Sequence, residues 1–265
     1  NNDVIQKTGL ILDRILMESP ELASTYQMDV SSSEVTQENI TITTNEKFSE
    51  YLKDINLLLY LKYPSVIELM QWKLNTEVEN QITLITYKKK CIPGSLSDAI
   101  KDNEHPLTLT DKVLTLYGIA KAICYFQSKF VVHNHLNAQN VSIYTDGKNK
   151  YPKIVNFKDS TIFYDPSTIE LDMFSKDLKS FRILVVEILK NEIFSSDLIN
   201  KNNDELIQQL TKELNAIEID SNLKDLIQNM ISFKNNPITV MRKFVEDIEN
   251  NIHSFKDVDK VIFEF

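Results

Sequence analysis

The stretch Val131-Val-His-Asn-His-Leu-Asn-Ala-Gln-Asn140, continued by Val141-Ser-Ile-Tyr144, decides how this chain folds. A second short strand pattern, Pro152-Lys-Ile-Val155, follows it, and an Asp146-Gly147 dipeptide lies between the two strand patterns. Asp-Gly between short apolar runs is a strong local signal for a hairpin turn. We therefore predict a polar loop that leads directly into a β-hairpin.

The sequence on the two sides of this loop differs in character. Upstream, β-rich segments at 39–43 and 81–87 flank one helical pattern at 46–61, and Cys91-Ile-Pro-Gly-Ser95 then interrupts the chain. Downstream, helical patterns dominate, at 95–100, 109–128, 175–190, 204–217, 221–232 and 238–250. We expect an α+β fold with a small β-rich lobe at 1–90 and a larger helical lobe at 91–265.

The patterns at 108–128 and at Val4 to Met17 also predict elements of secondary structure. Thr108-Leu-Thr-Asp111 matches a capping box before an apolar stripe, which predicts that 109–128 is a buried core helix. The segment Val4 to Met17 has spacing compatible with an amphipathic helix, but we favour a first strand at Leu10 to Leu16, the interpretation that fits the resemblance described next.

The loop and its surroundings resemble three motifs of protein kinases. The loop is similar to the catalytic-loop pattern HRDLxxxN, Asn156-Phe-Lys158 occupies the place of DFG, and 177–187 resembles the helix that anchors the family's large lobe. The matching residues are His133, Leu136, Asn140, Phe157, Asp177, Ser180 and Glu187. Order and spacing agree over nearly the whole chain, so the resemblance implies a protein-kinase-like bilobal fold.

The same resemblance implies that the catalytic groups have been lost. The aspartate that accepts the hydroxyl proton is replaced by His135, and the metal-binding aspartate of DFG is replaced by Asn156, a poor ligand for a hard divalent cation. Asn134 replaces the arginine that grips a phosphorylated loop. Phosphoryl transfer depends on the positioning of the phosphates, the metal ions and the attacking hydroxyl. Each replacement therefore removes a side chain that would hold one of them in place.

The phosphate cradle is also degenerate. Aligning Tyr26 with the glycine-rich loop pattern puts Glu18, Pro20 and Ala23 where the three glycines belong, and side chains there block close approach of the backbone to phosphates.

Two further positions concern the ion pair of the small lobe. Thr43 stands where the phosphate-pairing lysine is expected, and its helix partner aligns with Asp54. We expect Asp54 to have no lysine to meet.

The retained residues are interpreted as scaffold. We expect His133 to be a packed core residue, Asn140 to be a structural hydrogen-bonding group, and Asp177 to accept backbone N–H bonds from the loop. A zinc site at His133 and His135 is the alternative, but no third ligand is evident.

Only residues 159–164 separate Asn156-Phe-Lys158 from Asp165-Pro-Ser167, which stands in for the family's APE motif, so the segment is too short to dock a peptide. Ser167 replaces the APE glutamate and Asn236 replaces its arginine partner, a joint loss that is less costly than removing one member of a buried pair.

Composition excludes several function classes. A net charge of −9 and a pI near 5.1 argue against nucleic-acid binding, and Lys88-Lys89-Lys90 is interpreted as a solvated loop. The two cysteines, Cys91 and Cys124, predict no disulfide framework and favour a reducing compartment. No apolar run approaches the ~20 residues that span a bilayer. A chain that begins without methionine is expected to be part of a longer polypeptide.

The sequence thus predicts an intracellular pseudokinase, cytoplasmic or nuclear, that binds a protein partner such as an adjacent domain of its own polypeptide. No cofactor is expected, and weak metal-independent nucleotide binding stays open. The alternative is an atypical phosphotransferase or nucleotidyl transferase that uses His135 as its base.

Overall fold

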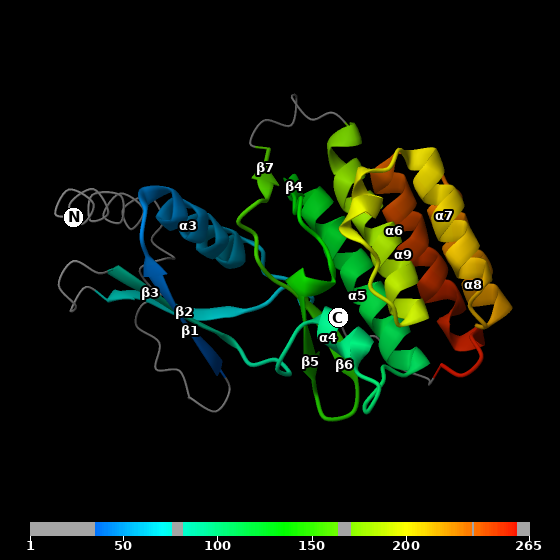
Figure 1. The fold of residues 1–265 in the computed structure, drawn as a ribbon, viewed down its shortest axis with the longest axis horizontal. Helices are drawn as coiled ribbons and strands as arrows, with labels where there is room; N and C mark the ends of the chain where they lie inside the picture. Colours follow the sequence, from blue (N-terminus) through cyan, green and yellow to red (C-terminus); the bar gives the residue numbers. More distant parts are fainter. Residues whose placement is uncertain (1–34, 76–81, 164–170, 235, 259–265) are drawn as a thin grey trace. The chain divides into compact units, whose positions relative to one another are not determined.

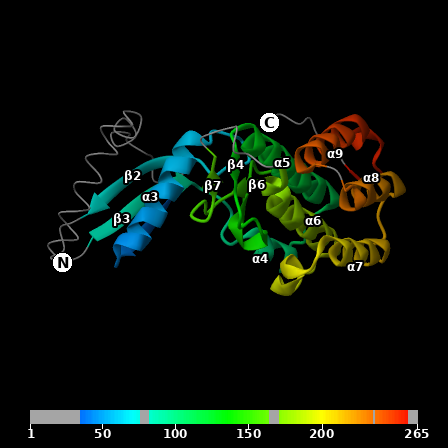
Figure 2. The same ribbon diagram turned by 90° about the horizontal axis from the view of Figure 1, so that it is seen from above.

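The computed structural model describes residues 35–75, 82–163, 171–234 and 236–258. The chain divides into two compact units, whose elements are shown in Figures 1 and 2. Of the described residues, unit 1 holds 35–62, 67–75, 82–91 and 156–158, and unit 2 holds 63–66, 92–155, 159–163, 171–234 and 236–258. Strands dominate the described part of the first unit and helices that of the second, which confirms the α+β class.

Unit 1 is built on an antiparallel three-stranded sheet. The strands are β1 (Val35–Ile42), β2 (Leu69–Asn75) and β3 (Ile82–Lys89), in the order β1-β3-β2. The structure extends both predicted strands, so that Lys88 and Lys89 belong to β3. The interpretation of the lysine triplet as a solvated loop is therefore wrong for these two residues. Lys88 lies on the same strand face as Thr86, because side chains alternate along a strand.

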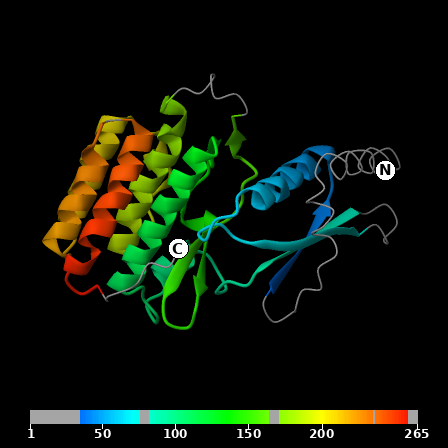
Figure 3. The same cartoon turned by 180° about the vertical axis from the view of Figure 1, so that it is seen from behind.

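Helix α3 (Asn45–Tyr60) lies along one face of this sheet (Figure 3). Thr44 caps it, since its side chain accepts a hydrogen bond from the backbone N–H of Lys47 at 3.2 Å. Phe48, Leu52 and Ile55 recur at helical spacing and are buried. Asp54 is buried with them, at 4% exposure, so a carboxylate lies among the apolar side chains of unit 1.

Unit 2 is a helical assembly around α5 (Leu109–Ser128). The predicted capping box is present: the Thr108 side chain accepts from the Asp111 N–H at 3.0 Å, and Asp111 accepts from the Thr108 N–H at 3.1 Å. Residues on nearly every side of α5 are buried, as expected for a core helix.

Four further helices confirm the predicted helical ranges and lie side by side in Figures 1 and 3. They are α6 (Ser175–Lys190), α7 (Asn203–Asn215), α8 (Ser221–Ser232) and α9 (Pro237–Asn251). Asn236 is the N-cap of α9 and accepts from the Ile238 N–H.

The predicted hairpin is formed by β5 (Val141–Thr145) and β6 (Lys150–Ile154). Asp146 accepts hydrogen bonds from the backbone N–H groups of Lys148 and Asn149, and Gly147 has a φ of +93°, which few other residues adopt. The remaining elements are short: α4 (Leu96–Lys101), β4 (Val131–Val132) paired with β7 (Thr161–Ile162), and the 3₁₀ segments at Ala138–Asn140, Leu171–Phe174, Ser196–Asn200 and Ile252–Ser254.

Several expectations lie outside the described residues. They concern Glu18, Pro20, Ala23, the strand at Leu10 to Leu16 and the segment Asp165-Pro-Ser167. Within the part of the chain that is described, no helix combines the length and the apolar character needed to cross a bilayer.

Gly118 on α5 generates the first prediction. A Cβ atom at this position would lie 2.6 Å from Pro152 Cγ and 3.0 Å from Ser65 Oγ. Gly118→Ala gains up to ~1 kcal/mol of helix propensity, but overpacking costs about 1–3 kcal/mol. We expect urea unfolding to show a net loss of stability.

Gly118→Ala combined with Pro152→Ala serves as the control for this explanation. The double variant removes the closest clash, so the two effects should be non-additive and part of the lost stability should return. A Gly118→Ala variant that is more stable than the parent would contradict the packing described.

Candidate functional site

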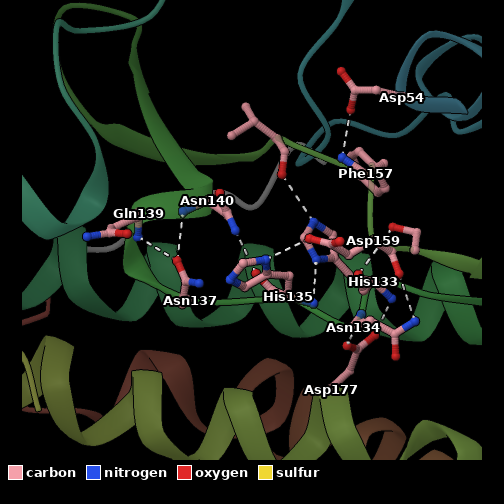
Figure 4. A network of polar contacts seen from close by, with 12 residues as sticks. Asp54, His133, Asn134, His135, Asn137, Gln139, Asn140, Phe157, Asp159 and Asp177 are labelled. Carbon is pink, nitrogen blue, oxygen red and sulfur yellow. Dashed lines mark hydrogen bonds and ion pairs between the residues drawn. The ribbon is translucent and has the colours of Figure 1, made fainter. Parts of the chain in front are cut away.

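The loop from His133 to Asn140 is fixed to α6 by a buried carboxylate (Figure 4). Asp177, 2% exposed, accepts hydrogen bonds from the backbone N–H groups of His133 at 2.7 Å and Asn134 at 2.9 Å. Burial raises the pKa of Asp177 to about 6, although the two hydrogen bonds oppose the shift. The predicted scaffolding role of Asp177 is thereby confirmed.

His133 is fully buried and closes the loop from within. Its Nε2 lies 3.1 Å from the carbonyl oxygen of Val155, and its Nδ1 accepts from the backbone N–H of His135 at 3.3 Å. Burial lowers the pKa of His133 to about 4, so the imidazole is neutral near pH 7. The expectation of a packed core histidine is confirmed.

His135, at the position of the catalytic base, points to a carboxylate that the sequence did not suggest. Its Nδ1 lies 2.8 Å from Asp159 Oδ2, and both side chains are more than half exposed. Asn134 also contacts this segment, because its Nδ2 donates to the carbonyl oxygen of Asp159 at 3.0 Å and to Thr161 Oγ1 at 2.8 Å. The only sequence signal for Asp159 is its place directly after Asn156-Phe-Lys158.

Asn140 turns its amide into the loop. Its Nδ2 donates to the carbonyl oxygen of His135 at 2.7 Å, and its backbone N–H donates to Asn137 Oδ1 at 3.1 Å. Asn137 accepts from the Gln139 N–H as well, and so caps the short 3₁₀ turn (Figure 4). The side chain of Asn140 thus contributes to the structure of the loop, as expected.

In unit 1, Asn156-Phe-Lys158 is held by helix α3. Asn156 has a φ of +65°, and the following residue, Phe157, is fully buried. The Phe157 N–H donates to Asp54 Oδ1 at 2.6 Å (Figure 4).

Asp54 does meet a lysine. Lys88 Nζ lies 3.7 Å from Asp54 Oδ2 and 3.1 Å from Glu38 Oε2. The expectation that Asp54 lacks a lysine is wrong, because the cation comes from β3 and not from the strand before the helix. Thr43, which takes the expected lysine position, is exposed between β1 and the cap of α3.

Unit 2 contains an open groove of about 1060 Å³ beside the loop, a volume that suits a small ligand or a peptide segment. Its lining includes His135, Asn137, Gln139, Asp159, Lys179, Ile183, Phe194 and Ile199. Half-buried apolar side chains thus adjoin polar amides and the His135–Asp159 pair.

No group of three histidine, cysteine, aspartate or glutamate side chains in the described ranges is placed to hold a metal ion. Both ring nitrogens of His133 lie against backbone groups, so a zinc site shared with His135 would require those contacts to break.

The fold and this loop define a protein-kinase-like domain. The family model described as protein tyrosine and serine/threonine kinase matches residues 25–197, more than half of the chain. The chain belongs to this family.

Similar curated proteins match shorter stretches. Spermatocyte protein spe-8 of Caenorhabditis elegans is 30% identical over 99 residues, which are 37% of this chain and 18% of that protein. Serine/threonine-protein kinase TAO3 of Gallus gallus is 27% identical over 107 residues, 40% of this chain and 11% of the kinase. The matched region therefore covers only a small part of each relative.

Two buried titratable groups, His133 in the loop and Asp177 on α6, predict an unusual pH dependence of stability. The folded pKa of His133 is lowered, so its contribution to stability is lost as pH falls from about 6.5 towards 4. The folded pKa of Asp177 is raised, so its protonation adds stability as pH falls from about 6 towards 3.8. The two effects oppose each other between about pH 4 and 6.

Asp177→Asn removes one of the two effects. Urea unfolding at pH 7 and pH 5 should show that this variant loses more stability on acidification than the parent does, by about 1 kcal/mol. Equal losses in the two proteins would contradict the assignment.

Proposed function

We propose that this chain is a catalytically inactive kinase-like domain that acts by binding protein surfaces inside the cell, as a scaffold or an allosteric regulator within a larger protein. Catalysis by the family depends on holding phosphates, metal ions and the attacking hydroxyl in line. Except at Asn140, the positions that would supply these contacts carry other residue types, and two of them, His135 and Asp54, have partners within the chain.

The observation that carries the proposal is the state of the loop from His133 to Asn140. The base position holds a histidine paired with Asp159, and the amide of Asn140 is committed to a carbonyl oxygen of its own loop. The base position therefore carries an imidazole where the family pattern has a carboxylate, and the Nδ2 contact of Asn140 serves to hold the loop together. The loop therefore supports a fold that is kept without its chemistry.

The residues at the metal-binding and phosphate-binding positions also support an inactive domain. Asn156 offers a neutral amide where a carboxylate is required. Glu18, Pro20 and Ala23 stand in for the glycines of the phosphate loop, and Thr43 stands in for the lysine. We therefore propose that the domain needs no cofactor. We further propose that its partners are proteins, including an adjacent domain of the same polypeptide, and are neither nucleic acids nor membranes.

Inactivity is tested with radiolabelled ATP, magnesium or manganese, and generic protein substrates. We expect no transfer above the buffer control, because His135 and Asn156 replace the catalytic aspartate and the metal-binding aspartate of the family pattern. The proposal would be overturned if the purified, folded protein transferred phosphate robustly and lost this activity on unfolding.

Nucleotide binding is tested separately by thermal unfolding with ATP, with and without magnesium. A ligand at 100 times its Kd adds about 2.7 kcal/mol, which is roughly 5 °C or more in Tm for a domain of this size. We expect a Tm shift smaller than about 1 °C that magnesium does not increase. A large shift that requires magnesium would contradict the loss of metal binding.

A second function is favoured by one contact, the 2.8 Å pair between His135 Nδ1 and Asp159 Oδ2. A carboxylate that orients an imidazole is the arrangement used to make histidine a general base. On this alternative the domain is an atypical phosphotransferase or nucleotidyl transferase.

His135→Ala discriminates between the two functions. The alternative predicts that it abolishes transferase activity and that Asp159→Asn lowers the activity at least tenfold. If the domain is a binding module, both variants should fold and should still bind the protein partner, because neither side chain is buried.

A further inference from the structure

The cluster around Asp54 has a property that the proposed function does not require. Its carboxylate is 4% exposed and receives two different partners, the Phe157 N–H on Oδ1 and the Lys88 ammonium near Oδ2. Burial of a carboxylate is costly unless hydrogen bonds, an opposite charge or both replace water. Asp54 therefore joins α3 to two other segments of unit 1.

Lys88 extends the connection across the sheet. Its ammonium lies 3.1 Å from Glu38 on β1, and Glu38 pairs in register with Thr86, two residues before Lys88 on β3. Lys88 therefore contacts two carboxylates, Glu38 on β1 and Asp54 on α3. One half-buried cation links β1, β3 and α3.

Lys158 makes a second contact between the same helix and the segment Asn156–Lys158. Its ammonium lies 3.9 Å from the centre of the Tyr51 ring, within the range of a cation–π interaction. Tyr51 precedes Asp54 by three residues, so both side chains project from neighbouring positions on α3. The helix consequently holds the backbone of Phe157 and the side chain of Lys158 together.

We infer that Asp54, Lys88, Lys158 and Tyr51 form a clamp that fixes helix α3 to β3 and to Asn156–Lys158 without nucleotide, metal ion or phosphorylation. Every contact in the clamp is made by atoms of the chain itself, so it is present before any ligand arrives. Lys88 supplies from β3 the cation that Thr43 does not supply. The position of α3 in unit 1 is then a constant of the fold and is not set by the contents of a nucleotide site.

The clamp is tested by hydrogen exchange of backbone amides, followed by NMR in ¹⁵N-labelled protein. Lys88→Met should accelerate exchange in the last two turns of α3 at least fivefold, because the charge of Asp54 is left buried without its cation. Lys90→Met is the matched control, since Lys90 is exposed just beyond the end of β3, and it should leave α3 unchanged. Lys88→Arg keeps a cation and should restore most of the protection.

Two substitutions of Asp54 separate its two contacts. Asp54→Asn keeps an acceptor for the Phe157 N–H but removes the charge, so α3 should loosen while the Phe157 amide stays protected. Asp54→Leu removes both contacts, and the Phe157 amide should exchange at least tenfold faster. Tyr51→Leu keeps an apolar side chain and should loosen only the Asn156–Lys158 segment.

The result that overturns the inference is equal α3 exchange in Lys88→Met and Lys90→Met. Slower exchange of α3 in the parent protein on addition of ATP and magnesium would overturn it as well, because the clamp should already be complete. Circular dichroism of each variant establishes that it is folded. The outcome is independent of the phosphotransfer assay, since an inactive protein can lack the clamp.

Discussion

The buried carboxylate of Asp177 is the constraint on which the loop from His133 to Asn140 depends. Its two oxygens must be satisfied inside unit 2, and they are satisfied by backbone N–H groups of His133 and Asn134. Because these bonds go to the backbone, the side chain at position 135 can change without breaking them. The loop can therefore carry a histidine at position 135, where the family pattern has an aspartate.

Unit 1 follows the same logic. Asp54 holds a backbone group, the Phe157 N–H, and this contact does not depend on whether the preceding residue is an aspartate or Asn156. In each unit, a buried carboxylate thus fixes a backbone segment next to a position where the family's catalytic pattern is changed. Both anchors hold backbone groups, which explains how the fold tolerates changes at the neighbouring positions 135 and 156.

Local signals made the fold predictable. The capping box at Thr108 and the Asp146-Gly147 turn specify their elements from adjacent residues, and the structure follows both. Contacts across the topology were not predictable in the same way. The pairs Lys88–Asp54 and His135–Asp159 join residues far apart in the chain, and no spacing rule connects them. The family pattern places the lysine on the strand before α3, at Thr43. It therefore does not predict that β3 supplies the cation, through Lys88.

We propose that the chain cannot assemble a nucleotide with divalent ions for in-line transfer. The most direct test is a crystal structure with a non-hydrolysable ATP analogue and manganese, in which anomalous scattering locates the metal. We predict no pair of manganese peaks near Asn140 and Asn156, and an Asn140 amide still bonded to the carbonyl oxygen of His135. An ordered triphosphate with two coordinated manganese ions would contradict the account.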